Sequence, residues 1–480
     1  MELGAHETVP GLKRGTQFEG DVRLDPSPCW RRDVKALAVP GIAPDGTRQT
    51  FVIHLEDFAE AREARAKPRV IVTTDGEGDD QCSMVRFLLY ANEWDLQGIV
   101  FSSSKHHWLG DGATPGYKWL GMEWLDEQLA AYAEVYPNLT LHDAGYPTPD
   151  YVKSQVYVGN ILLEGDMREP TPGSDHIARV LLQPETSPVW LQAWGGLKTI
   201  QEEHPERMAE VARKARIFLV AQQDSTFQDY IQKEWPGITT LGSTYDSYGA
   251  ISYRWHEFQS PEILPYFEPE WLLPNILQGH GPLGARYILK KGKYRSEGDS
   301  VAFLHLIDTG LRSAENPACG GWGGRFAIEE GAYWKSADKQ GMPPHSILRW
   351  AIDFQNDWAA RADWCVKPFE DANHPPEVVL DHSADLFAAP GERVTLRATN
   401  TRDPDGNALQ FRWWQHVEAG THAGPVEIQE PNRPECQVLM PSDVAPGDTI
   451  HLICAVTDDG TPPLSRYARV IITGANSTQE

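Results

Sequence analysis

The stretch KPRVIVTTDGEGDDQCSMVRFLLYANEWDLQGIVFSSS, residues 67–104, carries the most informative pattern of this chain. An apolar run at residues 70–72 is followed, within six positions, by four acids: Asp75, Glu77, Asp79 and Asp80. A segment with helical periodicity comes next, and then a second apolar run that ends in three serines. This order predicts two parallel β-strands joined by a helix that covers the sheet.

The same alternation continues along the chain. Further apolar runs, PVWLQAWGG and ARIFLVAQQD, are separated by helical-period segments such as EWLDEQLAAYAEVYP. Continuous apolar strands between amphipathic helices predict an α/β fold with an open, mostly parallel sheet covered on both faces. Ligands of open α/β sheets bind at the carboxyl ends of the strands. Four strands here end in small or polar residues, so the sequence directs four polar segments to one edge of the sheet.

Composition divides the chain into three predicted parts. Residues 1–66 form an N-terminal extension with a β element and a charged helical piece, and residues 67–370 form the α/β domain. In residues 371–480, short alternating runs such as LQFRWWQHV predict a C-terminal all-β, Ig-like sandwich that resembles PKD and cadherin modules. This sandwich could be a structural appendage or a carbohydrate-binding module. Cys436 and Cys454 could form a disulfide or remain free thiols.

Charge and hydropathy exclude several classes of partner. The net charge of -25 over 480 residues argues against nucleic acid and against an anionic membrane surface. No apolar run is long enough for a transmembrane helix, and the first residues lack the apolar core of a secretory signal. We therefore expect either a cytoplasmic protein or a chain that begins after a removed segment. The 17 tryptophans serve core packing or form platforms for sugar rings.

The crowded acids need a physical explanation, because neighbouring carboxylates repel one another unless a cation or shared protons offset the repulsion. One explanation is that Asp79 and Asp80 cap the positive end of a helix. Capping does not account for Asp75 at the strand end. A hard cation bound by oxygen ligands accounts for all of them, and Ca²⁺ is the predicted cofactor.

The motif DGEGDD, residues 75–80, is similar to the D-P-G-x-D-D signature of nucleoside hydrolases, which bind Ca²⁺ and cleave N-ribosyl bonds. The stretches VWLQAWGG, GHGPLG, GGWGGRF and QNDWAARADWCV extend the resemblance to about residue 370. Together they resemble a bacterial and fungal family of nucleoside hydrolase-like proteins with a C-terminal sandwich, labelled cellulose-binding Sde182-like. That resemblance implies a nucleoside hydrolase type of sheet and favours a secreted or periplasmic location.

The resemblance also implies roles for individual residues. Asp75 would bind Ca²⁺ and accept a proton from the attacking water, Asp79 would bind vicinal sugar hydroxyls, and Asp80 would be a bidentate metal ligand. The carbonyl of Trp194, in AWGGLKTI, and the carboxylate of Asp299, in EGDSVAFL, would complete the metal site. Further candidates for contact with the substrate are Glu77, Ser104, Lys105, Trp108, Asp224, His280 and Glu297.

Two positions depart from the family pattern. The proline of the signature is Gly76 here, and the histidine expected before Asp299 is Gly298, so the acid that protonates the leaving group is unassigned. The candidates to replace it are His106, His107, His280 and Glu297. The stretch SKHHWLG favours the first two, because both imidazoles follow the carboxyl end of a strand and histidine titrates near neutral pH.

The predicted function is a Ca²⁺-dependent glycoside or N-glycoside hydrolase that inverts the anomeric centre, with Asp75 as general base. The partner would be a small saccharide, glycoside or nucleoside, and Gly298 together with the sandwich favours a saccharide. A polysaccharide and a second copy of the chain, as a homo-oligomer, are further possible partners. The alternative is a non-catalytic carbohydrate (cellulose)-binding protein, and a third reading is a scaffold that kept the fold without the chemistry.

Overall fold

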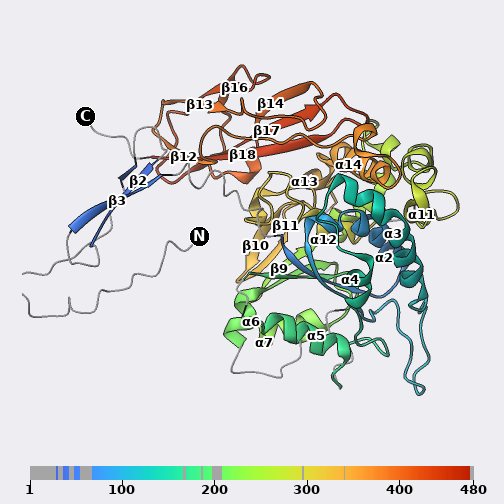
Figure 1. Ribbon diagram of the computed structural model, residues 1–480. Helices are drawn as coiled ribbons and strands as arrows, with labels where there is room; N and C mark the ends of the chain where they lie inside the picture. The colour runs from blue at the N-terminus through green and yellow to red at the C-terminus, as the bar shows by residue number, and fades with distance from the viewer. Residues whose placement is uncertain are drawn as a thin grey trace, which may run out of the picture. The chain divides into compact units, whose positions relative to one another are not determined.

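The computed structural model describes residues 29–30, 36–42, 48–54, 67–165, 169–184, 187–196, 208–294, 297–339 and 341–475 (Figure 1). It divides into two units, Met1–Lys67 and Pro68–Glu480. The first unit contains an antiparallel sheet of three strands, β1 (Cys29–Trp30), β2 (Ala36–Ile42) and β3 (Arg48–His54). The charged helical piece expected after this β element falls on residues 55–66, which lie outside the described residues.

An eight-stranded sheet forms the centre of the α/β region, in the order β10-β11-β9-β8-β7-β4-β5-β6. All neighbouring strands pair in parallel except β10, which is antiparallel to β11. The strands are β4 (Arg69–Thr74), β5 (Asp95–Phe101), β6 (Val156–Val158), β7 (Val189–Ala193), β8 (Ala215–Val220), β9 (Thr239–Ser243), β10 (Phe326–Glu330) and β11 (Tyr333–Ser336). The predicted open, mostly parallel sheet is therefore confirmed.

Helices cover both faces of this sheet, which explains why its central strands β4, β7 and β8 are mostly apolar. Val70 and Val72 of β4 join one core cluster, and Ile71 joins another on the opposite face. The first cluster includes residues of α2 (Gly78–Leu89), α3 (Glu123–His142), α12 (Ser300–Leu304) and α14 (Ala351–Trp364). The second includes residues of α5 (Pro172–Leu181), α6 (Met208–Lys214) and the π-helical turn η3 (Phe227–Ile231).

Short helices connect these elements, and many of them lie between β9 and α12. They are η1 (Ala91–Glu93), α4 (Pro149–Ser154), α7 (Gln232–Glu234), α8 (Tyr245–Tyr248), η4 (Gly249–Ile251), α9 (Trp255–Phe258), η5 (Leu264–Phe267), α10 (Pro269–Leu272), η6 (Leu273–Leu277), α11 (Gly281–Gly284), η7 (Pro317–Cys319), α13 (His345–Leu348) and η8 (Phe369–Asp371). Within the described part of the chain, none of the helices combines the length and the apolar character that a membrane span requires.

The C-terminal region is a sandwich of a four-stranded sheet, β12-β18-β17-β14, and a three-stranded sheet, β13-β16-β15. Side chains of both sheets share one core, which confirms the predicted all-β sandwich. Cys436 and Cys454 are buried in that core as free thiols. The elements are β12 (Asp385–Ala388), β13 (Arg393–Arg397), β14 (Leu409–Gln415), η9 (Val417–Ala419), β15 (Glu427–Gln429), β16 (Glu435–Leu439), β17 (Thr449–Asp458) and β18 (Ser465–Gly474).

Strand β18 contacts helix α14 of the α/β region through buried polar groups. Arg466 forms an ion pair with Asp357 at 2.7 Å, and the hydroxyl of Tyr467 donates to Asp353 at 2.5 Å. Tyr467 also belongs to the core cluster that includes α2 and α14. The sandwich is thus joined to the α/β region by packing and charge as well as by the chain.

Candidate metal and catalytic site

The turn between β4 and α2 has a backbone that proline cannot adopt. Gly76 has a φ of +73°, whereas a proline ring fixes φ near about -65°. A Cβ atom at this position would also lie 2.8 Å from Nε1 of Trp124. The departure of Gly76 from the family signature is therefore a change of turn geometry and not only of sequence.

This turn folds the acids back onto the end of β4. Asp80 Oδ1 accepts hydrogen bonds from the Thr74 hydroxyl at 2.6 Å and from the Asp75 backbone N–H at 3.2 Å. Asp75 Oδ1 accepts from the backbone N–H of Glu77 at 3.0 Å. The N-cap of α2 is Glu77, and no side chain makes a capping hydrogen bond there. Asp79 and Asp80 do lie in the first turn of α2, where the helix dipole favours acids, but this placement does not account for Asp75.

Two groups of potential ligands meet at this edge of the sheet. One group consists of Asp79, Asp80 and Asp299, each with a carboxylate oxygen within 4.8 Å of the others, and all three are buried. The other consists of Asp75, Glu77 and His107, under the same distance limit. We call these residues together the acidic cluster: Asp75, Glu77, Asp79, Asp80, Asp299 and His107. Asp299 reaches it from the start of α12, more than 200 residues along the chain.

Electrostatics at the cluster disfavours the charged carboxylates. Burial, followed by the charges of Glu77 and Asp75, raises the pKa of Asp79 to about 7. Burial and the neighbouring acids also raise the pKa of Asp80 and of Asp299 well above the usual value. Asp79 Oδ1 and Asp299 Oδ2 are buried without a hydrogen-bond partner. Buried oxygens of this kind fit a hard cation such as Ca²⁺, which takes six to eight oxygen ligands.

The end of β7 lies directly against this turn. The backbone N–H groups of Trp194 and Gly195 both donate to the Thr73 carbonyl, at 3.1 and 3.0 Å. A Cβ atom on Gly195 would lie 2.8 Å from the Asp75 backbone nitrogen, so only glycine allows this approach. The backbone from which the predicted carbonyl ligand would come is therefore adjacent to Asp75. Residues 197–200 of the AWGGLKTI stretch are outside the described range.

The loop after β5 presents one of its two imidazoles to the acids. The Ser104 N–H donates to the His107 carbonyl at 2.9 Å, and the Ser104 hydroxyl accepts from the His106 N–H at 3.0 Å. This tight turn places His107 Nδ1 at 3.5 Å from Asp75 and 3.6 Å from Glu77. Burial opposes the charged ring of His107, but Asp75 and Glu77 raise its pKa overall. His106 is exposed, and partial burial lowers its pKa.

Three further predicted residues lie on the loops around the cluster. The Lys105 ammonium donates to the carbonyl of Gln222 at 2.5 Å, which ties the loop after β5 to the loop after β8. Asp224 lies two residues further along that second loop and is buried. Trp108 is half-buried, and its ring stacks on Tyr117 with centroids 4.8 Å apart.

Two predicted residues are held by other partners. His280 lies 3.2 Å from Asp363 and contacts the Pro274 carbonyl at 2.7 Å. Glu297 is fully buried and pairs with Arg86 at 2.9 Å. Neither belongs to the acidic cluster, although Glu297 is only two positions from Asp299.

Position 298, where the family pattern has a histidine, faces the cluster. A Cβ atom on Gly298 would lie 3.1 Å from Asp79 Oδ2 and 3.5 Å from the Tyr248 ring. Glycine leaves this space without an imidazole. The chain thus offers a titratable ring from the loop after β5, at His107, and none at position 298.

Two tyrosines near the cluster are absent from the sequence-based prediction. The hydroxyl of Tyr253 donates to Glu77 at 2.9 Å, and burial followed by the charges of Asp79 and Glu77 raises its pKa. Burial and the charge of Asp79 also raise the pKa of Tyr248. Both lie in the short helical turns after β9, where no hydrophobic period or motif marks them.

The fold is thus an open, mostly parallel α/β sheet with buried carboxylates at its carboxyl edge, followed by a β-sandwich. A family model described as "Cellulose-binding Sde182, nucleoside hydrolase-like domain" matches residues 69–326. A second, "Cellulose-binding protein Sde0182, C-terminal domain", matches residues 393–474. The chain belongs to the cellulose-binding Sde182 family of nucleoside hydrolase-like proteins.

One solved structure is similar over most of this chain. A nucleoside hydrolase-related hypothetical protein from Saccharophagus degradans, associated with carbohydrate metabolism, is 28% identical, with a TM-score of 0.70, over 85% of this chain and 100% of its own. A plant nucleoside hydrolase, PpNRh1, is 11% identical with a TM-score of 0.33, over 63% of this chain and 99% of its own, and this likeness is too distant to support an inference. A search of curated proteins found no match.

Proposed function

We propose that this protein is a Ca²⁺-dependent hydrolase of glycosidic bonds. The observation that carries the proposal is the convergence of Asp79, Asp80 and Asp299, buried within 4.8 Å of one another, with two carboxylate oxygens that lack partners. Asp75 is linked to this group through its backbone hydrogen bond to Asp80. Such an arrangement costs free energy unless a cation binds.

By the family pattern, Asp75, Asp80 and Asp299, with the Trp194 carbonyl, would hold the ion. The structure groups Asp80 and Asp299 with Asp79, and Asp75 hydrogen-bonds to Asp80 through its backbone N–H. When bound, Ca²⁺ would supply a coordinated water of lowered pKa. Asp75 would accept a proton from a water held at this site, and Asp79 would accept hydrogen bonds from vicinal hydroxyls of the sugar. The surrounding carboxylates stabilise the positive charge that develops on the sugar ring in the transition state.

His107 is the residue that we assign to the leaving group. Its ring faces Asp75 and Glu77 from the loop after β5, and these carboxylates raise its pKa in the metal-free protein. His106 is exposed and has a lowered pKa, so it suits this role less well. Direct attack by water, without a covalent intermediate, inverts the anomeric centre and needs the acid on the opposite face of the sugar. For this role the His107 ring, which lies 3.5 Å from Asp75, would have to turn away from that carboxylate when the substrate binds.

A saccharide is the proposed substrate class. The name of the family refers to cellulose binding, and the S. degradans relative is associated with carbohydrate metabolism. Gly298 replaces the histidine that would serve a purine leaving group. The second candidate function, binding of a polysaccharide without catalysis, is favoured by the same family name and by the C-terminal sandwich.

The test is a screen of p-nitrophenyl furanosides, p-nitrophenyl pyranosides and nucleosides, with Ca²⁺ and with EGTA. We expect turnover of at least one glycoside, abolished by EGTA and restored by Ca²⁺. The same full-length protein is incubated with insoluble cellulose and the bound fraction is measured. Retention on cellulose without turnover of any compound would favour the binding function and reject the hydrolase.

A further inference from the structure

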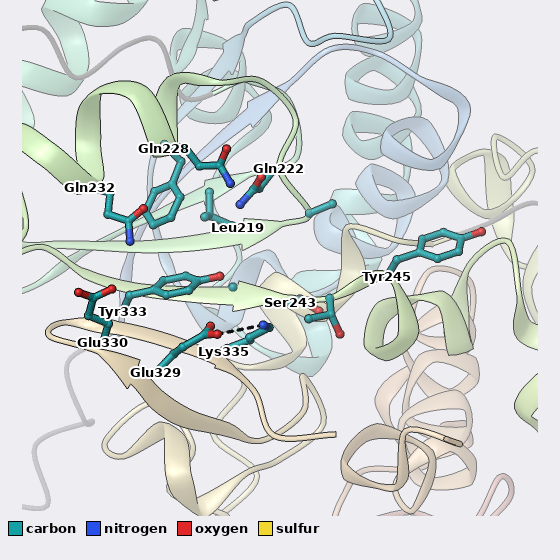
Figure 2. A pocket seen from close by; sticks show the side chains of 14 residues that line it. Leu219, Gln222, Gln228, Gln232, Ser243, Tyr245, Glu329, Glu330, Tyr333 and Lys335 are labelled. Atoms are coloured by element: carbon teal, nitrogen blue, oxygen red, sulfur yellow. Dashed lines mark hydrogen bonds and ion pairs between the residues drawn. The ribbon is translucent and has the colours of Figure 1, made fainter. Parts of the chain in front are cut away.

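A polar cavity of about 640 Å³ opens at the carboxyl ends of β8 and β9, next to the β10–β11 hairpin. Its size falls within the range of about 300 to 1,000 Å³ that is typical of small-molecule sites. Figure 2 shows the amides of Gln222, Gln228 and Gln232 on one side of the cavity, and Tyr333 and Lys335 on the hairpin opposite them. None of these residues belongs to the acidic cluster.

Hydrogen bonds connect the loop after β8, which lines the cavity, to the loop after β5. Gln222 lines the cavity, and its carbonyl accepts a hydrogen bond from the Lys105 ammonium at 2.5 Å. The backbone N–H of Lys105 donates to the Gln223 carbonyl at 2.8 Å. Lys105 directly precedes the two histidines of the loop after β5. The wall of the cavity is therefore bonded to the loop that carries His107.

A second line of contacts leads to the cluster through helix α8. Tyr245 lines the cavity, is exposed, and contacts the ring of Tyr248 edge to face at 5.5 Å. Tyr248 in turn lies beside Gly298, which faces the Asp79 carboxylate. Two separate chains of contacts thus connect the lining of the cavity to residues beside the cluster.

The lining indicates what kind of ligand fits. Primary amides both donate and accept hydrogen bonds, as sugar hydroxyls do, and tyrosine faces suit the C–H faces of sugar rings. Ser243 adds a hydroxyl that is only 4% exposed and has no hydrogen-bond partner. The one cation of the lining, Lys335, pairs with Glu329 at 3.0 Å. An anionic group would find no free positive charge among these lining residues.

The hairpin also positions an aromatic face in the cavity. Tyr333 on β11 lies across Gly242 on β9, where a Cβ atom would be 2.3 Å from the tyrosine hydroxyl. Because position 242 has no side chain, the ring lies close to the sheet and its hydroxyl reaches the strand end. The cavity thus combines amides, hydroxyls and a flat ring with a second acid, Glu330, and its lining has no free positive charge to select an acidic ligand.

We infer that this cavity is a subsite for a further sugar unit of a neutral oligosaccharide whose reacting unit lies at the acidic cluster. The inference rests on the proposed function and narrows its substrate to a chain of at least two sugars. A single sugar or a nucleoside would contact the cluster alone, whereas an oligosaccharide would contact both sites and bind more tightly.

The experiment is calorimetric titration of the full-length protein, in the presence of Ca²⁺, with cellotetraose, xylotetraose, glucose, adenosine and tetragalacturonate. We expect a neutral tetrasaccharide to bind more tightly than glucose or adenosine. The Gln228→Ala/Gln232→Ala double variant should weaken its binding about 10-fold, the equivalent of losing one or two hydrogen bonds. Binding of glucose should stay within about twofold, since glucose uses only the cluster. Lys233→Ala, an exposed change on the same short helix, is the matched control.

Four results would overturn the inference: equal binding of cellotetraose and glucose, unchanged binding in the double variant, preference for tetragalacturonate, or no binding of either neutral tetrasaccharide. The hydrolase proposal fails separately. Tetrasaccharide binding that depends on the glutamines, with no turnover in any condition, rejects hydrolysis and keeps the subsite. If turnover depends on calcium but tetrasaccharide binding is unchanged in the Gln228→Ala/Gln232→Ala variant, the subsite is rejected and the hydrolase proposal stands.

Discussion

Buried aspartates occur in two regions of this protein, and the two regions differ in how far neighbouring positive groups balance the negative charge. On α14, Asp357 lies 3.2 Å from Arg361 and 2.7 Å from Arg466, and it accepts a hydrogen bond from the Tyr90 hydroxyl at 2.7 Å. Burial alone would raise the pKa of Asp357, but Arg466 and Arg361 hold it below the usual value. In the acidic cluster, the pKa of each of Asp79, Asp80 and Asp299 is raised instead.

The difference is a difference in cations. Within the described part of the chain, His107 is the one ion-pair partner of the cluster, whereas Asp357 has two guanidinium groups. The charges at α14 are complete without any ligand, which is typical of a structural network. The cluster concentrates negative charge that the chain itself does not balance, and such violations of local rules mark functional sites.

The largest expected effect comes from Asp80→Asn in the acidic cluster. The variant keeps an oxygen that can accept from the Thr74 hydroxyl but loses a charged bidentate ligand. We expect Ca²⁺ binding and turnover to be lost together in calorimetry and in the glycoside assay. The melting temperature of the metal-free protein should not fall, because one buried, unbalanced charge is removed.

The control for this prediction is Asp126→Asn, an exposed acid in the first turn of α3. It should bind Ca²⁺ like the wild type. Unchanged calcium affinity in Asp80→Asn, or a large loss of metal-free stability, would show that the cluster is a structural network like the one at α14.

The next largest effect is expected from replacing His107, the one cationic partner of the cluster among the described residues. His107→Gln should lower kcat by about 10²- to 10⁴-fold, the usual contribution of a general acid. His106→Gln, at the exposed neighbouring ring, should change kcat less than about threefold, because surface changes outside a site have small effects. Steady-state kinetics on the best glycoside would decide this, and equal losses in the two variants would contradict our assignment of His107.

At α14 the corresponding change should affect stability and not metal binding. Asp357→Asn leaves Arg361 and Arg466 buried without their carboxylate, which should lower the free energy of unfolding by about 3 to 5 kcal/mol. Urea denaturation measures the loss, and calcium titration should give the wild-type affinity. Asp371→Asn, at an exposed acid close to the end of α14, is the control. A stable Asp357→Asn variant would mean that the two aspartate groups do not differ as we describe.

The fold could be predicted from sequence where strands are buried on both faces. The runs that became β4, β5, β7 and β8 are mostly apolar, so a parallel sheet could be predicted, although the order of its strands could not. The shorter strand TTLGS of β9 and the β10–β11 hairpin were not predicted. They are short or exposed on one face, so they lack the apolar run that marks a buried strand.

The candidate site could be predicted where its residues share one stretch, as Asp75, Asp79 and Asp80 do. His107 stood among four candidates, because sequence does not say which loop turns toward a distant acid. Glu297 shows that a residue close in sequence to a member of the cluster need not reach the cluster itself. Its neighbour Asp299 reaches the cluster, while its own carboxylate pairs with Arg86, a residue 211 positions away.

A smaller effect that distinguishes the two regions is the increase in the free energy of unfolding when calcium binds. Calcium at 100 times its dissociation constant should raise the free energy of unfolding by about 2.7 kcal/mol, since only the folded cluster binds it. The same increment should appear in Asp357→Asn, from a lower baseline, and should disappear in Asp80→Asn. Thermal melts with and without EGTA would measure it. An increment that vanishes in Asp357→Asn would mean that the two regions are coupled.

The smallest expected effect is a pH dependence of the unfolding free energy that Asp357→Asn loses. The folded pKa of Asp357 lies below the unfolded value of about 3.9, so its carboxylate stabilises the fold above that value. This stabilisation disappears as the pH falls through the folded pKa, where the wild-type side chain becomes neutral like asparagine. The difference in unfolding free energy between wild type and variant should therefore be constant from pH 8 to about pH 5 and narrow below about pH 4. Urea denaturation across this range measures the difference. A gap that stays constant to the lowest pH at which the protein is folded would mean that packing of the side chain, and not its charge against Arg361 and Arg466, stabilises this junction.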